Sequence, residues 1–398
     1  MTYTVLLYGA TGYSGRLIAA EARVDGMAAA DAPNDYRMVL AGRDAAALRD
    51  MATDLGMDYR VAALDDRDRL RELLADADVV INAAGPFAFT ALPMAKAALA
   101  TGCHYVDING ELDVYKRLDD YSDLAVQRDV VMVCSAGHMT AASDVLLDWV
   151  LSNWRAQGHG EGSRLAAVRI ALSRIPSFSR GSGETVTRSF REQVTVVRAV
   201  ERNERPQMVL WHEPVGRLER TFDLGARDAN GRGSLRIASA TNLVDTLTAR
   251  ATLQRHGVVA DTIESYMESG TAYRLANQVA ALVAPLTACT VMRGLARVQV
   301  GLLPDGPTEE EREREGHVIV LEVDELDAVP LERLRWETPN VYQLTSQLVL
   351  AVAKRAVVSK AYGWRTPAAI LGTTGTGFGV QDVPDSGPFR NCRLVAAH

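Results

Sequence analysis

A strand-like run at the start of the chain leads directly into a glycine-rich turn. The sequence YTVLLYGATGYSG places Gly9, Gly12 and Gly15 immediately before a helical pattern. In such a turn the first glycine permits the tight bend, the second lets the backbone approach a phosphate, and the third lets the helix pack against the strand. The N–H groups at the start of the helix then bind the phosphates. We predict a pyrophosphate site formed by Gly9, Ala10, Thr11, Gly12, Tyr13, Ser14 and Gly15.

A glycine and a basic residue end the next strand-like run. That run reads LAGRD, with Gly42 and Arg43 where an NAD-specific site usually carries an acidic residue for the ribose hydroxyls. Arginine can form two hydrogen bonds with a 2′-phosphate, and a glycine beside it leaves room for that group. Asp44 is alternatively the N-cap of the following helix. The pattern predicts that the chain binds NADP(H) in preference to NAD.

Small residues end another strand-like run. The sequence VVINAAGPF adds little side-chain bulk at the carboxyl end of its strand, and ligands of open parallel sheets bind at that edge. We therefore expect this segment to contact the cofactor. The predicted contacts are Asn82, Ala84, Gly85, Pro86 and Phe87.

Polar side chains that can transfer a proton occur in the next two strand-like runs. These runs end in YVDINGE and CSAGH. Because the carboxyl ends of parallel strands meet at one edge of a sheet, Asp107, Asn109 and Ser135 should lie there together. The candidate catalytic residues are Glu111, Tyr105 and His138.

Each catalytic candidate also has a structural interpretation. Glu111 favours the start of the helix that follows it, strand alternation buries Tyr105, and a loop histidine such as His138 is often only hydrogen-bonded. The Tyr-x-x-x-Lys pair of short-chain reductases is missing, because Lys116 follows Tyr115 immediately. The residues therefore leave the catalytic acid unassigned.

The first third of the chain alternates short apolar runs with amphipathic stretches. This is the pattern of a parallel sheet with crossover helices, so we expect an α/β fold with a doubly wound Rossmann domain over residues 1–148. The expected strands are Thr4–Tyr8, Arg37–Ala41, Tyr59–Ala62, Val79–Asn82, Tyr105–Ile108 and Val130–Cys134. The expected helices are Tyr13–Arg23, Ala45–Leu55, Arg67–Leu74, Ala91–Thr101 and Val114–Gln127.

The middle of the chain predicts a second domain of mixed structure. Strand-like runs alternate with long helical or polar segments, so we expect an α+β substrate or dimerisation domain over residues 149–338. The charged run EEEREREG within Pro304–Gly316 predicts a solvated loop and the end of a helix. The strand-like runs are Ala166–Leu172, Met208–Trp211 and His317–Val323.

The C-terminal part predicts a return to the first domain. Asn340–Ala361 is apolar on one face and rich in helix formers. We expect C-terminal helices over residues 339–398 to pack on the Rossmann domain.

Two segments of the middle region could shape a substrate site. SRGSGET, residues Ser179–Thr185, could surround a substrate or one end of a cofactor with backbone N–H groups, or could simply begin a capped helix. The apolar stretch Val279–Met292 is too short to span a bilayer and predicts a buried helix or the wall of an apolar pocket.

Composition excludes several other classes of protein. The net charge of −7 gives no general attraction for nucleic acid or an anionic membrane. The four cysteines form no C-x-x-C pair, and no further ligands gather near Cys134 and His138, so we expect no disulfide framework and no metal site. No signal-peptide pattern opens the chain and no stretch is long enough to cross a membrane. These features are typical of a cytoplasmic protein.

Six motifs together resemble one known family. They are GATGYSG, LAGRD, NAAGPF, YVDINGE, CSAGHMTAASD and the late TPAAILG. They resemble the saccharopine dehydrogenase-like oxidoreductases, particularly the branch of bacterial trans-acting enoyl reductases. The resemblance is densest from Tyr3 to Asp148 and weaker from Arg312 to Gly372. One departure is the turn CSAGHMTAASD, where relatives often have an acidic or aromatic residue after the glycine, so His138 marks a different substrate.

The resemblance implies a Rossmann domain, an α+β domain and last helices that return to the first domain. In the trans-acting branch NADPH reduces an enoyl thioester that a polyketide synthase presents, generally on an acyl carrier protein. True saccharopine dehydrogenases instead act on an amino acid and a 2-oxo acid through an imine. The second domain of such enzymes often forms a homodimer. No family acid can be transferred to a numbered position of this chain.

Three functions follow as hypotheses. The leading one is NADPH-dependent reduction of a polarised double bond, most simply an enoyl thioester in polyketide or lipid biosynthesis. An imine or carbonyl reductase of a small amino-acid-like metabolite would instead need arginines for carboxylates, with Arg174, Arg180 and Arg188 as candidates. A redox sensor that binds NADP without turnover is the third.

Overall fold

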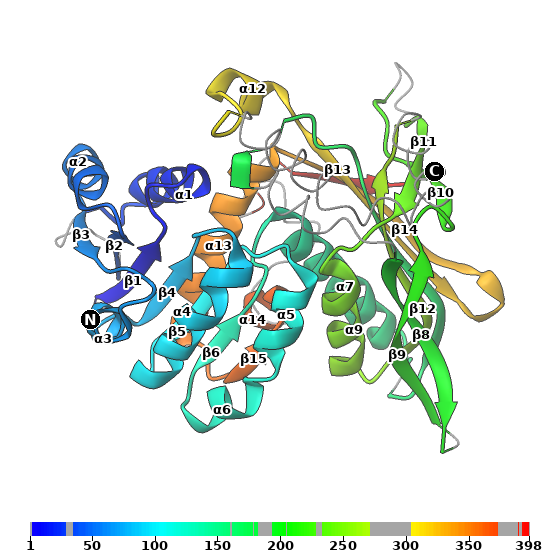
Figure 1. Cartoon of the computed structure of the whole chain (residues 1–398). Coiled ribbons are helices and arrows are strands. Elements are labelled where there is room, and N and C mark those ends of the chain that lie inside the picture. The colour runs from blue at the N-terminus through cyan, green and yellow to red at the C-terminus, as the bar shows by residue number, and fades with distance from the viewer. Residues whose placement is uncertain are drawn as a thin grey trace, which may run out of the picture. The chain divides into compact units, whose positions relative to one another are not determined.

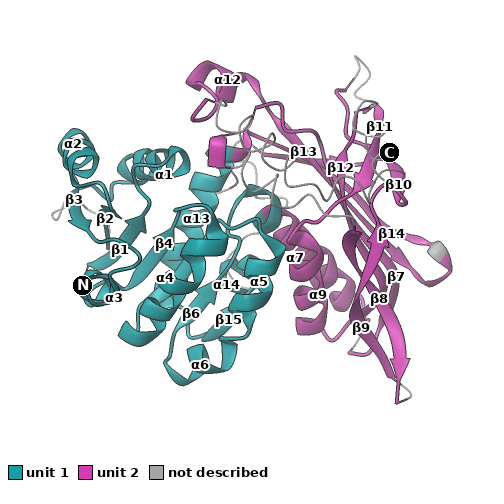
Figure 2. Ribbon diagram, viewed as in Figure 1, with its two compact units in different colours: residues 1–141, 342–372 teal, residues 142–341, 373–398 magenta. Residues whose placement is uncertain are grey.

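The computed structural model divides the chain into two compact units (Figure 2). The first contains residues 1–141 and 342–372, and the second contains residues 142–341 and 373–398. The structure describes residues 2–28, 35–159, 161–177, 179–181, 193–203, 205–227, 233–270, 304–372, 389 and 392–397.

The first unit is built on a parallel sheet of seven strands in the order β15-β6-β5-β4-β1-β2-β3 (Figure 1). The chain winds outward from β1 to one edge and then from β4 to the other, so the order reverses between β1 and β4. This confirms the predicted doubly wound α/β fold, and in such sheets ligands generally bind at the reversal of the strand order. The strands are β1 (Tyr3–Tyr8), β2 (Tyr36–Gly42), β3 (Asp58–Val61), β4 (Val79–Asn82), β5 (His104–Asp107), β6 (Val131–Val133) and β15 (Gly363–Arg365).

Helices cover the first sheet, as its apolar strands require. One core cluster joins buried strand residues such as Leu7 and Ile81 to residues of α1, α2 and α13. Helix α4 contacts β4 and β5 and packs between α3 and α5. The helices are α1 (Tyr13–Val24), α2 (Ala45–Leu55), α3 (Arg67–Leu74), α4 (Phe87–Thr101), α5 (Leu112–Asp119), α6 (Ser122–Gln127), α13 (Val341–Val358) and α14 (Pro367–Leu371).

One predicted helix is two helices. The expected Val114–Gln127 is broken at Asp120 and Tyr121, between α5 and α6. The break falls in the sequence DDYSD, where aspartate and serine side chains compete with the helical hydrogen bonds of the backbone.

The C-terminal segment is shared between the units. The predicted helix over Asn340–Ala361 is α13, whose residues Val349 and Ala353 are buried in the core of the first unit. Strand β15 then extends the first sheet beside β6. We expected the whole segment to pack on the first domain. Residues 393–396 instead form β16, which pairs with β14 of the second unit. Neither β15 nor β16 was predicted, because each gains strand structure from its pairing with a strand that is distant in sequence.

The second unit has a mixed sheet in which β10-β11-β12-β7-β13-β14-β16 form the main path and the β8–β9 hairpin joins at β12. The three predicted strand-like runs lie in β7, β9 and β13. The strands are β7 (Arg164–Leu172), β8 (Gln193–Arg202), β9 (Arg205–Pro214), β10 (Glu219–Asp223), β11 (Leu235–Ala240), β12 (Val259–Glu268), β13 (His317–Glu325), β14 (Pro330–Thr338) and β16 (Arg393–Ala396). The helices are α7 (His138–Ala156), α9 (Asp245–Arg255), the exposed α12 (Glu309–Arg314) and the short 3-10 turn η1 (Leu326–Ala328).

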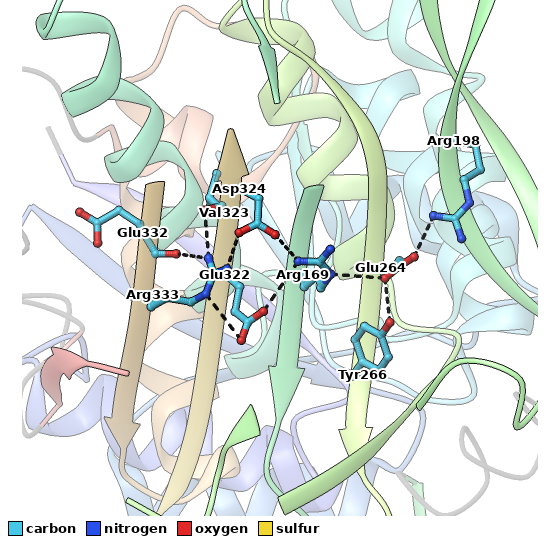
Figure 3. Close-up of polar contacts among 9 residues, drawn as sticks. All are labelled: Arg169, Arg198, Glu264, Tyr266, Glu322, Val323, Asp324, Glu332 and Arg333. Atoms are coloured by element: carbon cyan, nitrogen blue, oxygen red, sulfur yellow. Dashed lines mark hydrogen bonds and ion pairs between the residues drawn. The ribbon is translucent and has the colours of Figure 1, made fainter. Parts of the chain in front are cut away.

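A row of alternating charges crosses this sheet (Figure 3). Strand register sets Arg333 opposite Glu322, Glu322 opposite Arg169, and Arg169 opposite Glu264. Arg169 also binds Asp324 at 2.5 Å. Opposite charges directly across neighbouring strands stabilise the pairing, so the row fixes the register of four strands.

A buried histidine in the second unit gives a testable pH dependence. Burial lowers the pKa of His317 to about 4, and its Nδ1 lies 3.2 Å from Ser173 Oγ. In the unfolded chain a histidine has a pKa of about 6.5, so the unfolded state binds a proton that the folded state excludes. The free energy of unfolding therefore falls as the pH drops from about 6.5 towards 4. Between pH 7 and pH 5, wild type should lose about 2 kcal/mol more of its unfolding free energy than the His317→Asn variant loses. Urea titrations of both proteins at both pH values measure this difference. Parallel pH curves for the two proteins would contradict this.

Candidate cofactor site

The glycine turn between β1 and α1 packs too closely for side chains at two of its three glycines. Gly9 has a φ of +84°, and a Cβ on it would lie 2.7 Å from the backbone nitrogen of Ala84. A Cβ on Gly15 would lie 2.2 Å from the carbonyl oxygen of Gly9. The strand, the turn and the helix therefore meet backbone against backbone at the reversal of the strand order.

Gly12 differs from its two neighbours in the motif. It is exposed, and a Cβ there would meet only the Gly9 carbonyl oxygen, at 3.3 Å. The packing of the protein itself therefore makes little demand for glycine at this position. Close approach of a ligand is the remaining physical reason for it.

The N-terminus of α1 is suited to an anion. Its N-cap is Gly12, and no side chain caps the helix. Helices α2 and α3, by contrast, are capped by the carboxylates of Asp44 and Asp66. Because no side chain caps this twelve-residue helix, the positive charge of its N-terminal end can attract a bound phosphate. The turn and helix therefore fit the pyrophosphate of a dinucleotide.

Arg43 lies exposed at the end of β2. Over the described ranges no carboxylate forms an ion pair with it. Its positive charge opposes the rise that burial causes in the pKa of Tyr8, so the guanidinium lies on the same side of the sheet end as the Tyr8 hydroxyl, which donates to the Ala62 carbonyl. A Cβ on Gly42 would touch only Leu48, at 3.8 Å, so that glycine is not required by packing. Gly42 and Arg43 leave room and a positive charge for a 2′-phosphate, and their role in binding it stays a prediction.

The alternative interpretation of Asp44 holds. Its Oδ1 accepts hydrogen bonds from the backbone nitrogens of Ala46 and Ala47, both at 3.1 Å. The carboxylate is thereby directed at α2, and it caps that helix.

The predicted contacts from Asn82 to Phe87 form the loop between β4 and α4. Asn82 Oδ1 accepts a hydrogen bond from the Ala84 nitrogen at 3.2 Å, and the Thr90 hydroxyl donates to the Ala84 carbonyl. A Cβ on Gly85 would meet nothing within 4 Å. The loop is therefore held at Ala84 and free of side-chain bulk at Gly85, next to the glycine turn.

The polar residues predicted at the ends of β5 and β6 lie in one buried network. Asp107 is its centre: its Oδ1 accepts from the nitrogens of Ser135 at 2.8 Å and Asn109 at 3.0 Å, and its Oδ2 accepts from the Tyr105 hydroxyl at 2.7 Å. Asn82 Nδ2 donates to that hydroxyl at 3.4 Å. Burial raises the pKa of Asp107, and burial together with Asp107 raises that of Tyr105.

The three catalytic candidates occupy different environments. Tyr105 is fully buried with its proton in the bond to Asp107. Glu111 is 7% exposed, and its carboxylate accepts from the nitrogens of Phe87 at 2.9 Å and Ala88 at 3.2 Å, across the start of α4. His138 begins α7, is 2% exposed, and its backbone nitrogen donates to Thr345 Oγ1 at 3.0 Å. Their catalytic roles stay predictions.

Sequence reasoning missed two residues of this region. Thr90 and Thr345 hold the β4–α4 loop and the start of α7, but they lie inside helices, where a threonine carries no motif. The turn at Ser135, with a φ of +66°, was also not foreseen. Its left-handed backbone is held by the bond to Asp107.

Other predicted features lie elsewhere. Arg180 pairs with Asp305 at 3.3 Å, and the Arg174 backbone nitrogen donates to Glu268 at 3.0 Å. Residues 182–185 of SRGSGET, Arg188 and the stretch Val279–Met292 lie outside the described residues. Within the described part of the chain no group of histidine, cysteine or acidic side chains could hold a metal ion. No helix there is both long and apolar enough to cross a membrane.

Comparisons with known proteins agree with this geometry. Residues 5–133 match the family described as saccharopine dehydrogenase NADP binding domain. A trans-acting enoyl reductase of Mycobacterium ulcerans is 28% identical over 193 residues, which are 47% of this chain and 44% of that protein. A lipid droplet localized protein of Caenorhabditis elegans is 28% identical over 191 residues, 46% of this chain and 43% of that protein. The match thus spans less than half the length of either relative.

A solved structure shares the fold over most of the chain. It is apo saccharopine dehydrogenase (L-Glu forming) from Saccharomyces cerevisiae, with a TM-score of 0.56, 14% identity, and coverage of 92% of this chain and 94% of that one. Together with the glycine turn and the open N-terminus of α1, the comparisons identify the cofactor. Residues 5–133 match a saccharopine dehydrogenase NADP binding domain, and NADP(H) is the cofactor of this domain.

Proposed function

We propose that the chain reduces a polarised carbon–carbon double bond, in an enoyl thioester, with NADPH. The observation that carries the proposal is the cofactor site itself: a glycine turn, an α1 N-terminus without a capping side chain, and Arg43 without an ion-pair partner in the described residues. The choice of an enoyl substrate is supported by the relatives named trans-acting enoyl reductase.

The cofactor supplies the hydride, and the residues of the chain orient the reaction. Arg43 would hold the 2′-phosphate, and the α1 N-terminus would hold the pyrophosphate. The ends of β4, β5 and β6 then lie on the nicotinamide side, because β2 holds the adenosine side and the dinucleotide crosses the reversal between β1 and β4. A site fixed in this way positions the ring before the substrate arrives.

For the proton we propose His138. The Tyr105 hydroxyl donates a hydrogen bond to Asp107, and the Glu111 carboxylate accepts from the Phe87 nitrogen. His138 begins α7 directly after the turn that follows β6. A histidine that donates the proton should make kcat depend on pH near its pKa. The His138→Asn variant should lower kcat at least tenfold and leave the Kd of NADPH unchanged.

The substrate proposal includes its mode of delivery. We propose that the enoyl group arrives on the acyl carrier protein of a polyketide synthase, and that the reaction takes place in the cytoplasm. We also propose that the second unit contacts the acyl chain or a second copy of the protein. The apolar stretch Val279–Met292 of the sequence supports an apolar substrate.

The test is NADPH oxidation, followed at 340 nm, with crotonyl and longer enoyl groups presented both on pantetheine and on an acyl carrier protein. We expect oxidation with at least one form, and saturated thioester as the product by mass spectrometry. Oxidation with a 2-oxo acid plus an amino acid, but with neither thioester, would favour imine reduction instead. Tight NADPH binding without oxidation by any of these substrates would favour a sensor.

A further inference from the structure

Glu111 has a partner that its position in the sequence does not suggest. It is the N-cap residue of α5, yet its side chain does not cap that helix. Both carboxylate oxygens instead bind α4, which begins 24 residues earlier: Oε1 accepts from the Phe87 nitrogen at 2.9 Å and Oε2 from the Ala88 nitrogen at 3.2 Å. A carboxylate at the positive end of a helix makes charge-assisted hydrogen bonds.

The segment that carries Glu111 is itself fixed. Asn109 Oδ1 accepts from the Glu111 nitrogen at 2.8 Å, and Asn109 Nδ2 donates to the Glu111 carbonyl at 3.1 Å. The Asn109 nitrogen in turn donates to Asp107, which also binds the turn at Ser135. The five residues Asp107–Glu111, DINGE, therefore tie together the loops that follow β4, β5 and β6.

We propose that Glu111 is a positioning residue for the nicotinamide half of the cofactor. It anchors the start of α4, and thereby the preceding loop Ala83–Pro86, whose Ala84 lies beside the glycine turn. Ala84 in this loop approaches Gly9 so closely that a Cβ on Gly9 would lie 2.7 Å from the Ala84 nitrogen. Without this anchor the start of α4 could move, and the loop would then shift at the place where the nicotinamide half of the cofactor is proposed to bind. The inference rests on the orientation of NADPH given under the proposed function, but not on the substrate.

The physical contrast is between the two ends of the cofactor. Arg43 directly follows β2, and β2 lies on the other side of β1 from β4. Loss of the Glu111 anchor should therefore weaken the binding of a ligand that contains the nicotinamide half and spare one that lacks it. A general loss of folding would weaken both.

The experiment is calorimetric titration of NADPH and of 2′,5′-ADP, which lacks the nicotinamide half, into wild type, Glu111→Gln and Glu72→Gln. Glu72 is exposed on α3, so its replacement controls for the loss of one charge. We expect Glu111→Gln to raise the Kd of NADPH about tenfold and to leave that of 2′,5′-ADP within twofold, because glutamine cannot accept from both nitrogens through two oxygens. Glu72→Gln should match wild type with both ligands.

A second variant tests the loop without changing any charge. Thr90→Val removes the hydroxyl that donates to the Ala84 carbonyl, so it should show the same selective loss of NADPH binding. Retained binding of 2′,5′-ADP shows that the first unit is folded in each variant.

Equal weakening of both ligands, or no change in NADPH binding in a folded Glu111→Gln protein, would overturn the positioning role. Failure of wild type to bind NADPH would overturn the proposed function and this inference with it. Failure to reduce enoyl thioesters, with the selective loss intact, would overturn only the substrate.

Discussion

Gly15→Ala should lower the unfolding free energy of the protein by about 3 kcal/mol, at the upper end of the range for overpacked sites. The added Cβ would lie 2.2 Å from the Gly9 carbonyl oxygen and 2.7 Å from that of Ala10, and these are backbone atoms that cannot rotate away. Alanine gains roughly 1 kcal/mol of helix propensity over glycine, which is too little to offset the displacement of the turn. NADPH binding should be lost with the turn.

The matched control is Gly12→Ala, three residues earlier in the same motif. Its Cβ would approach only one backbone atom, at 3.3 Å, so thermal unfolding should stay within a few degrees of wild type. NADPH affinity should nevertheless fall, because that Cβ would occupy the exposed approach to the α1 N-terminus. Calorimetric melting curves and NADPH titrations of both variants check the pair. A Gly15→Ala protein as stable as wild type would show that the helix can move away from the turn.

Arg43→Ala should raise the Kd of NADPH by about 30-fold, which corresponds to about 2 kcal/mol for a lost guanidinium–phosphate pair at an exposed site. The Kd of NADH should change little, because NADH has no 2′-phosphate. The variant should therefore lose the preference for NADPH without losing the fold. Titration of both nucleotides into both proteins measures the change.

Arg71→Ala serves as the control for this prediction. Arg71 is also an exposed arginine of the first unit, but it lies on α3 and pairs with Asp68 at 3.5 Å. Its replacement should leave both dissociation constants unchanged. Equal losses for NADPH and NADH in Arg43→Ala would mean that Arg43 supports the fold and does not select the 2′-phosphate.

The sheet and the cofactor turn could be predicted because their signals are local. The central strands of the first unit, such as β1 and β4, are apolar runs beside turns, and the three glycines of the motif lie within seven residues. The helix break at Asp120 was predictable in principle from the composition of DDYSD. Strand β15 was not, since three residues gain strand structure only from pairing with β6.

The role of Glu111 could not be predicted from its neighbours in sequence. A carboxylate before a helix indicates a cap for that helix, and the local pattern favours α5. The Glu111 carboxylate instead binds α4, and the Asn109 side chain holds both the backbone nitrogen and the carbonyl of Glu111. Contacts between segments 23 or 24 residues apart depend on the sheet order, which brings the ends of β4 and β5 together.

The most direct test of the cofactor site is a crystal structure of the chain with NADP+ bound. We predict the pyrophosphate at the N-terminus of α1 beside Gly12, the 2′-phosphate within hydrogen-bonding distance of Arg43, and the nicotinamide on the side of β4. A dinucleotide bound away from the turn between β1 and α1, or with its 2′-phosphate remote from Arg43, would contradict the assignment.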